Sequence, residues 1–507
     1  MRSKLPVLLT VCAAVLAINL DTTIVNVALP SISTDLDAGT RALQWIVDGY
    51  NLAFAALVLA AGSLSDRYGR RPALILGLLG FAAASTVGAL VDSAGALVAA
   101  RVAMGAAAAV IFPTTLSIIS NTFRERRERA AALGIWGAVV GIGVAAGPVT
   151  GGLLLEHFAW GSVFWALVPL AVVTAGAAYV LVPESRDPSV PRLDLPGLAL
   201  SVAMLSTLVL TIIEAPEQGW SSPEIIGGFV LSAVLLLGFV AVERRAEHPM
   251  LDLSLFRDRR FSAASGAVTV TFFALFGFIF LITQYFQFVR GYGTLSTGAR
   301  ILPVALSIAV ASVVGAILAP RIGTKAVVST GLLLFGSAFL WVSTVSVDAS
   351  YATVIVPQMV LMGLGMGFIS TPATESILLV LPPSRAGVGS AVNDATRELG
   401  GTLGVAVVGS VFSSVYAARL GDGTWAQLPG DVLASAQDSV GAAAAIAAGQ
   451  PGLGDGFQDA FMSGLHTGSL VIGLLCLAGA VVGLFALPGR GTHAPEDTLV
   501  DAVPVPA

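Results

Sequence analysis

A charged stretch between two apolar runs decides the fold: residues 62–72 read GSLSDRYGRRP. Its charged members are Asp66, Arg67, Arg70 and Arg71. Such side chains cannot remain in hydrocarbon, so the apolar runs on either side must both leave the membrane here. Gly69 permits a positive φ, and Pro72 suits the first turn of a following helix. The stretch therefore predicts a tight polar hairpin between two membrane helices, although any short cytoplasmic loop also carries some arginine.

The composition of the 507-residue chain is that of an integral membrane protein. Apolar residues make up 56% and charged residues 11%, and the mean hydropathy of +0.87 is too high for a soluble enzyme. There is no basic stripe for nucleic acid. Cys12 and Cys476 lie in apolar runs, which argues against a disulfide framework. Every histidine lies at or outside a predicted helix end, so we expect no metal site and no cofactor.

The apolar runs predict an all-α membrane protein. A helix that crosses about 30 Å of hydrocarbon at about 1.5 Å per residue needs about 20 apolar residues. By this measure the sequence contains fourteen spans. They are 7–29, 44–64, 73–91, 96–119, 130–154, 161–182, 195–213, 225–242, 261–289, 298–318, 326–345, 352–374, 387–413 and 462–487.

The distribution of basic residues predicts the orientation of these spans. Arginine and lysine concentrate in one set of alternate loops, which marks the cytoplasmic side. Both termini are therefore expected in the cytoplasm, and the Ala-, Gly- and Arg-rich composition points to the plasma membrane of a bacterium. Segment 417–460 should be external and mobile, and the acidic tail 490–507 disordered.

The sequence contains an internal repeat. DRYGRR at 66–71 precedes an apolar helix, as does PRIGTK at 320–325, and Met-Gly and Pro recur at similar places in spans 4 and 12. Spans 1–6 and 9–14 therefore look like related halves, with spans 7 and 8 inserted, although chance similarity between Ala/Gly-rich helices could give part of this. The predicted divisions are 1–190, an N-terminal six-helix bundle; 191–260, the inserted helices with a cytoplasmic loop; 261–489, a C-terminal six-helix bundle containing loop 417–460; and the tail 490–507.

Span 1 contains a carboxylate, Asp21, and span 4 a guanidinium, Arg101. An ionised group within a membrane helix costs several kcal/mol unless it faces protein or water. Counted from the expected outer ends of their spans, Asp21 lies about 12 Å deep and Arg101 about 8 Å deep, so the two can pair. The pair is either a static contact that fixes helix packing, or a proton site that loosens when the acid is neutralised.

Span 5 is marked by small residues: Gly134, Gly143, Gly147, Pro148, Gly151 and Gly152. The spacing of four from 143 through 147 to 151 places three glycines on one face, where another helix can approach closely. Proline in a helix removes a hydrogen bond and produces a kink. Ordinary close packing accounts for this pattern equally well.

Further acids occur in spans 2 and 13. Asp48 and Tyr50 follow a tryptophan that suits the membrane interface, so Asp48 is either solvated at the outer rim or placed in a substrate cavity. Asp394 and Glu398 share a helix face, while Arg397 is spaced to neutralise Asp394. Span 13 thus carries either an acidic ridge near the midplane or a helix-internal ion pair near the cytoplasmic end.

These motifs resemble those of the major facilitator superfamily. The loop at 62–72 resembles its signature loop between helices 2 and 3. LDTTIVNVALP at 20–30, RVAMG at 101–105 and the glycines of span 5 resemble the motifs of its 14-span drug:H+ antiporter branch. The resemblance implies proton coupling by Asp21 and Arg101, an exporter motif in span 5, and a substrate cavity whose residues are Asn26, Asp48, Tyr50, Asp394 and Glu398.

The resemblance implies a proton-coupled antiporter, not an enzyme, that exports drug-like or antibiotic compounds by alternating access. The membrane acids weakly favour lipophilic cations as substrates. The expected partners are a small molecule, protons and the bilayer, without nucleic acid, and the expected state is a monomer. Export of an endogenous metabolite or lipid, and a transporter-like sensor without transport, are the alternatives.

Overall fold

The computed structural model describes residues 4–186, 194–247, 249, 251–380, 386–450 and 452–487. In chain order its α-helices are α1 (Leu5–Asp35), α2 (Thr40–Tyr68), α3 (Arg70–Leu90), α4 (Ala94–Thr122), α5 (Arg126–His157), α6 (Ser162–Trp165), α7 (Leu167–Leu181), α8 (Leu195–Gln218), α9 (Pro223–Glu243), α10 (Arg259–Gln284), α11 (Thr294–Ile322), α12 (Thr324–Val342), α13 (Val356–Leu379), α14 (Ala386–Leu420), α15 (Gly430–Asp438), α16 (Val440–Gly449) and α17 (Gly454–Ala486). Two π-helical turns, η2 (Tyr285–Val289) and η3 (Tyr351–Ile355), adjoin α10 and α13.

The described helices include 14 that are long and apolar enough to cross a membrane. This confirms the number of spans and the all-α class. Several helices are longer than predicted: α1 continues beyond residue 29 to Asp35. The prediction measured only the apolar run, whereas a helix continues into polar sequence once it has left the hydrocarbon.

The predicted hairpin at 62–72 is confirmed. α2 ends at Tyr68, and α3 begins at Arg70. Gly69 between them has φ = 133°, a conformation that residues with a Cβ atom rarely adopt. The repeated sequence forms the same turn, because Gly323 separates α11 from α12 with φ = 94°.

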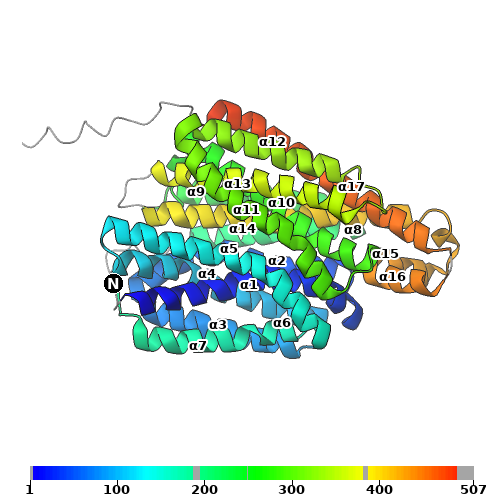
Figure 1. The fold of residues 1–507 in the computed structure, drawn as a ribbon, viewed down its shortest axis with the longest axis horizontal. Coiled ribbons are helices and arrows are strands. Elements are labelled where there is room, and N and C mark those ends of the chain that lie inside the picture. The colour runs from blue at the N-terminus through cyan, green and yellow to red at the C-terminus, as the bar shows by residue number, and fades with distance from the viewer. Residues whose placement is uncertain are drawn as a thin grey trace, which may run out of the picture.

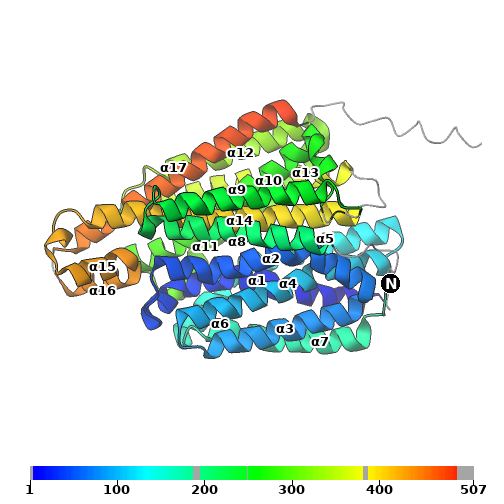
Figure 2. The same cartoon turned by 180° about the vertical axis from the view of Figure 1, so that it is seen from behind.

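The helices form two groups with matching contacts. In the first group, α1–α7, the main pairs are α1 with α5, α2 with α4, α3 with α4, and α3 with α7. In the second group, α10–α14 and α17, they are α10 with α14, α11 with α13, α12 with α13, and α12 with α17. The first group lies below the second in Figure 1. Figure 2, seen from behind, shows α8 and α9 side by side on the face toward the viewer. The inserted helix α8 contacts both α2 and α14.

The two groups meet mainly through α2 with α14 and α5 with α11. We call the end that holds α15 and α16 the outer end, and the end where the described chain starts at Lys4 and stops at Leu487 the inner end (Figure 1). The α2–α14 and α5–α11 contacts detailed below come from the outer parts of these helices.

The described residues of segment 417–460 are folded, so the prediction of a mobile loop is wrong. Trp425 is 1% exposed, and its indole donates to the Leu453 carbonyl at 3.0 Å. The Tyr416 hydroxyl donates to the Ala436 carbonyl at 3.1 Å. These buried aromatic residues give α15 and α16 a small core that an average over the Ala/Gly-rich composition conceals. The tail 490–507 lies outside the described residues.

Candidate functional site

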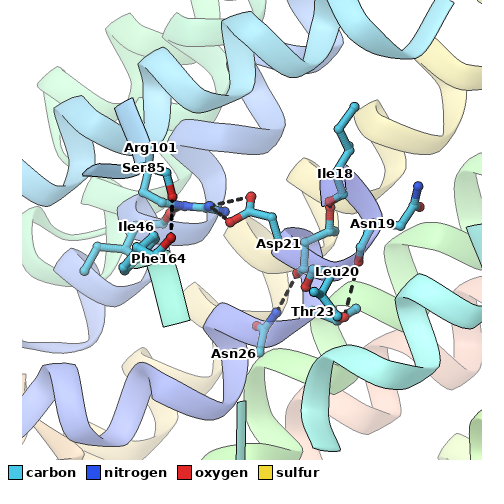
Figure 3. A network of polar contacts seen from close by, with 11 residues as sticks. Ile18, Asn19, Leu20, Asp21, Thr23, Asn26, Ile46, Ser85, Arg101 and Phe164 are labelled. Atoms are coloured by element: carbon cyan, nitrogen blue, oxygen red, sulfur yellow. Dashed lines mark hydrogen bonds and ion pairs between the residues drawn. The ribbon is translucent and has the colours of Figure 1, made fainter. Parts of the chain in front are cut away.

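Asp21 and Arg101 form the predicted ion pair between α1 and α4 (Figure 3). Arg101 Nη1 donates to both carboxylate oxygens of Asp21, at 2.7 and 2.8 Å. The side chains are 0% and 1% exposed. α1 continues to Asp35, past the residue from which the depth of Asp21 was counted, so that depth stays a prediction. The pairing is nevertheless confirmed.

Helix α2 holds the arginine from the other side. Arg101 Nε donates to the Ile46 carbonyl at 3.0 Å, and the guanidinium carbon lies 4.4 Å from the centre of the Tyr50 ring. The fully buried Tyr50 also lies within electrostatic range of Glu398. Tyr50 therefore contacts Arg101 of the ion pair and also experiences the charge of Glu398 of α14. Asn26 is buried too, and its amide donates to its own helix, at Thr22.

The glycine face of α5 packs closely on α1. A Cβ at Gly143 would lie 2.9 Å from the Asn19 Cβ, and one at Gly147 would lie 3.0 Å from the Ile24 amide nitrogen. A Cβ at Gly151 would lie 2.9 Å from the side chain of Ile24. Any larger residue would push α1 away, so the predicted close approach is confirmed.

The remaining motif residues of α5 behave differently. Gly152 and Pro148 face the second group: a Cβ at Gly152 would lie 2.6 Å from the Leu295 Cα of α11, and the Pro148 carbonyl lies against Gly298. A Cβ at Gly134 would have no neighbour within 4 Å, so this glycine is not used for close packing here. One helix therefore contacts α1 and α11 through separate sets of small residues.

Asp48 is 0% exposed, so its predicted alternative placement at a solvated rim is wrong. Neither of its carboxylate oxygens has a hydrogen-bond partner in the part of the chain that the structure describes. It lies one helical turn from Gln44, which bonds to α14, and one turn from Leu52, which packs on Ile212 of α8. Asp48 is thus an unpaired acid on the face of α2 that adjoins α8 and α14.

The acids of α14 form no ion pair with the neighbouring arginine in the described part of the chain. Asp394 is 5% exposed, and Arg397 makes no ion pair with it or with Glu398 among the described residues. Arg397 Nη2 instead donates to Thr374 Oγ1 of α13 at 3.3 Å. The predicted helix-internal ion pair is therefore wrong in this conformation, because the guanidinium is directed to another helix.

Two ion pairs of the charged turn at 62–72 lie within its own group. Asp66 accepts a hydrogen bond from Arg70 Nε at 2.7 Å, and Arg71 lies 3.5 Å from Glu184. Arg67 lies over the ring of Tyr68. These contacts leave the turn attached to the segment that follows α7. Nowhere in the described ranges do three potential metal ligands come together.

The structure contains membrane-length helices in two matching groups, and an ion pair and unpaired acids are buried among them. These features define a polytopic membrane transport protein. The chain belongs to the Major Facilitator Superfamily, whose family profile matches residues 11–405.

Similar proteins are named for drug resistance and efflux. The chain is 36% identical to the multidrug resistance protein Stp of Mycobacterium tuberculosis (strain CDC 1551 / Oshkosh), over 83% of this chain and 78% of that protein. It is 35% identical to the multidrug efflux pump LfrA of Mycolicibacterium smegmatis (92% and 93% covered). It is 32% identical to the tetracenomycin C resistance and export protein of Streptomyces glaucescens (99% and 94% covered).

The fold has counterparts among solved structures. A bacterial homolog to the human lysosomal transporter Spinster, in an inward-facing and occupied conformation, matches with a TM-score of 0.69. The match covers 96% of this chain and 97% of that one at 15% identity, so it shows the fold alone.

Proposed function

We propose that this protein is a proton-coupled antiporter that exports drug-like or antibiotic compounds across the bacterial plasma membrane. The observation that carries the proposal is the buried Asp21–Arg101 pair. The names of relatives at 32–36% identity support the substrate class. One chain supplies both helix groups, so a monomer suffices.

The ion pair gives a proton a way to change helix packing. Protonation of Asp21 removes the carboxylate charge, while Arg101 keeps its bond to Ile46 and its contact with Tyr50. A buried guanidinium without its counter-charge is costly, which favours a rearrangement of α1 against α4. Asp21 is therefore the proton site, and Arg101 is the group that senses its charge.

A path of close contacts connects that rearrangement to the second group. α1 bears on the glycine face of α5, and α5 bears on α11 through Gly152 and the Pro148 carbonyl. Helices in such close backbone contact cannot shift independently. A movement of α1 on protonation is therefore transmitted to the outer contact between the groups.

The helix groups are the bodies that alternate access, with residues 1–190 and 261–489 as the two halves and 191–260 as the inserted pair. Both termini and the turn at 62–72 face the cytoplasm, following the distribution of basic residues. The outer contacts then close the external side, and the state described here takes up substrate from the cytoplasm. Asn26, Asp48, Tyr50, Asp394 and Glu398 are the residues assigned to the substrate, and the acids among them favour cations.

Proton release in inside-out vesicles tests the proposal. The collapse of an imposed pH gradient is measured while cationic, neutral and anionic antibiotics are added to wild type and to Asp21→Asn. Asp92→Asn is the matched control, because Asp92 is exposed between α3 and α4. We expect collapse with cations in wild type and in the control, and none in Asp21→Asn. Coupled export that persists in Asp21→Asn would refute the assigned proton site.

A further inference from the structure

The orientation of Arg397 is unexpected for its position in the sequence. It follows Asp394 by three residues on α14, a spacing at which opposite charges on a helix attract each other. Its guanidinium nevertheless forms no ion pair with either acid in the described part of the chain and instead contacts α13 and α10. Its contacts there are Thr374 Oγ1, 3.3 Å from Nη2, and the Phe272 ring, whose centre lies 5.2 Å from the guanidinium carbon.

The hydroxyl of Thr374 orders two side chains of α14 at once. It donates its hydrogen to Asn393 Oδ1 at 3.1 Å and accepts the hydrogen bond of Arg397. A hydroxyl has one hydrogen and two lone pairs, so these bonds do not compete. Asn393 Nδ2 then approaches Asp394 Oδ1 only at 3.5 Å, which is a weak contact.

As a result, both acids keep a free oxygen. Asp394 Oδ2 and Glu398 Oε2 are buried, and neither has a hydrogen-bond partner among the described residues. The titratable groups that act on Glu398 are Asp394 and Arg397 of its own helix, and Glu398 in turn acts on Tyr50 of α2, which is not a cation. Arg397 is thus the neighbouring positive charge, and its orientation decides whether the acids are neutralised.

We propose that Thr374 and Phe272 are positioning residues that hold Arg397 away from Asp394 and Glu398. The two carboxyl groups then remain available to a proton or to a cationic substrate. This inference rests on the proposed function of these acids. It adds two residues of other helices that keep the acids free, one through a hydroxyl and one through an aromatic face.

The proposal makes Arg397 a competitor of proton and substrate. If the hydroxyl of Thr374 is removed, the guanidinium loses its hydrogen-bond acceptor, and the nearest strong acceptors are the acids of its own helix. An arginine beside a carboxyl group favours its charged form. The acids should then hold protons less tightly, but only as long as Arg397 is present.

Carbodiimide labelling tests this directly, because dicyclohexylcarbodiimide reacts with protonated carboxyl groups in apolar surroundings. The full-length protein in proteoliposomes is labelled over a range of pH, and modification of Asp394 and Glu398 is quantified by mass spectrometry. This measurement does not depend on knowing the transported compound. The variants are Thr374→Val, Thr374→Ser, Phe272→Leu, Arg397→Gln and the double variant Thr374→Val/Arg397→Gln.

We expect Thr374→Val to lower the pH of half-maximal labelling by about one unit or more. Phe272→Leu should shift it in the same direction by less, and Thr374→Ser, which keeps the hydroxyl, should match wild type. In the double variant the shift should disappear. A purely structural role of Thr374 predicts instead that the shift persists without Arg397.

Three results would overturn the inference: no shift in Thr374→Val, a shift that persists in the double variant, or wild-type acids that resist labelling at every pH. Phe272→Leu replaces Thr374→Val if the latter does not fold. Transport of tetraphenylphosphonium separates this inference from the proposed function. If Thr374→Val shifts the labelling as expected but Glu398→Gln transports this cation like wild type, the substrate role of Glu398 is refuted. The positioning role of Thr374 then stands.

Discussion

The two ends of the molecule are held together in different ways. At the outer end, uncharged groups join the two helix groups: the Gln44 amide donates to the Ala406 carbonyl at 3.1 Å, the Thr294 hydroxyl to Gly152 at 3.2 Å, and the Gln287 amide to Val27 at 3.0 Å. At the inner end, the ion pairs between described residues lie within the first group: Lys4 with Glu128, Asp66 with Arg70, and Arg71 with Glu184.

The outer end therefore holds the two groups together in this conformation, whereas the charges of the inner end are available for contacts between the groups in another conformation. Neutral bonds to backbone carbonyls require close approach, which glycines on α5, α11 and α14 permit at the outer end. Ion pairs on an exposed surface contribute about 0–1 kcal/mol each and exchange partners easily. The inner charges can therefore re-pair when that end closes, whereas the outer end depends on shape.

Gly298→Val should disturb the closure of the outer end most severely. A Cβ at this position would collide with the Pro148 carbonyl, and overpacking at such a site costs about 1–3 kcal/mol. We expect the outer end to open and export to fall by about tenfold or more. Labelling of a cysteine placed at Thr294 by an impermeant thiol reagent measures the opening. Gly134→Ala is the control, because nothing lies within 4 Å of a Cβ there. Unchanged labelling would show that α5–α11 contact does not close the outer end.

Gln44→Met should weaken the same closure by less. Its amide also reaches Ser410 Oγ at 3.3 Å, and a neutral hydrogen bond contributes about 0.5–1.5 kcal/mol. Because methionine fills a similar volume, we expect a severalfold rise in the same cysteine labelling without loss of folded protein. If Gln44→Met labels like wild type while Gly298→Val does not, α5–α11 alone closes the outer end.

The sequence predicted those features that depend on local physical cost. A charge in hydrocarbon requires an explanation, so Asp21, Arg101 and the turn at Gly69 could be recognised without the structure. The three glycines at a spacing of four likewise predicted a close helix contact on their face, and the structure identifies the partner as α1. In each case a residue type that is costly or unusual at its place indicated its role.

Features that depend on partners distant in the sequence were missed. Gln44 and Gly298 are ordinary residues in apolar helices, and only the packing of the two groups gives them a role. Arg397 was assigned to the nearest acid because spacing along a helix shows local neighbours only. Thr374 of α13 determines its direction, and no spacing rule relates the two. The placement of Asp48 was left open for the same reason: it is buried, and the helices α8 and α14 that contact α2 are far from it in sequence.

Asp66→Asn tests the inner end. In this conformation Asp66 pairs with Arg70 one turn away, and both side chains are partly exposed, so loss of the pair should lower the stability of the folded protein by about 1 kcal/mol or less. If the turn re-pairs when the inner end closes, transport turnover should fall severalfold. Turnover in vesicles and thermal unfolding of the same preparation check both parts. Turnover equal to that of wild type would show that the inner charges are topological determinants only.

The smallest expected effect concerns the contact of α15–α16 with the first group. Asp438 lies against Gly39, and the neighbouring Ser439 hydroxyl lies 3.3 Å from that of Ser33. Burial raises the pKa of the Asp438 carboxyl, the carboxylates of Glu217 and Asp37 raise it further, and Arg41 opposes them. When α15 and α16 are docked on the first group, Asp438 thus binds its proton more tightly than when they are free. Docking is therefore strongest at low pH and weakens as the pH rises through the raised pKa.

Because Asp438 remains partly exposed to water, we expect only a modest change in the docked population, in the range above the ordinary carboxyl pKa of 3.8. Spin labels at Thr34 and Ala434 measure it as a distance distribution that broadens as the pH is raised. Asp438→Asn should abolish this dependence and favour docking at every pH, whereas Asp431→Asn, an exposed acid of the same helix, should retain it. A dependence that survives in Asp438→Asn would mean that an acid of the first group or of α8 governs the docking.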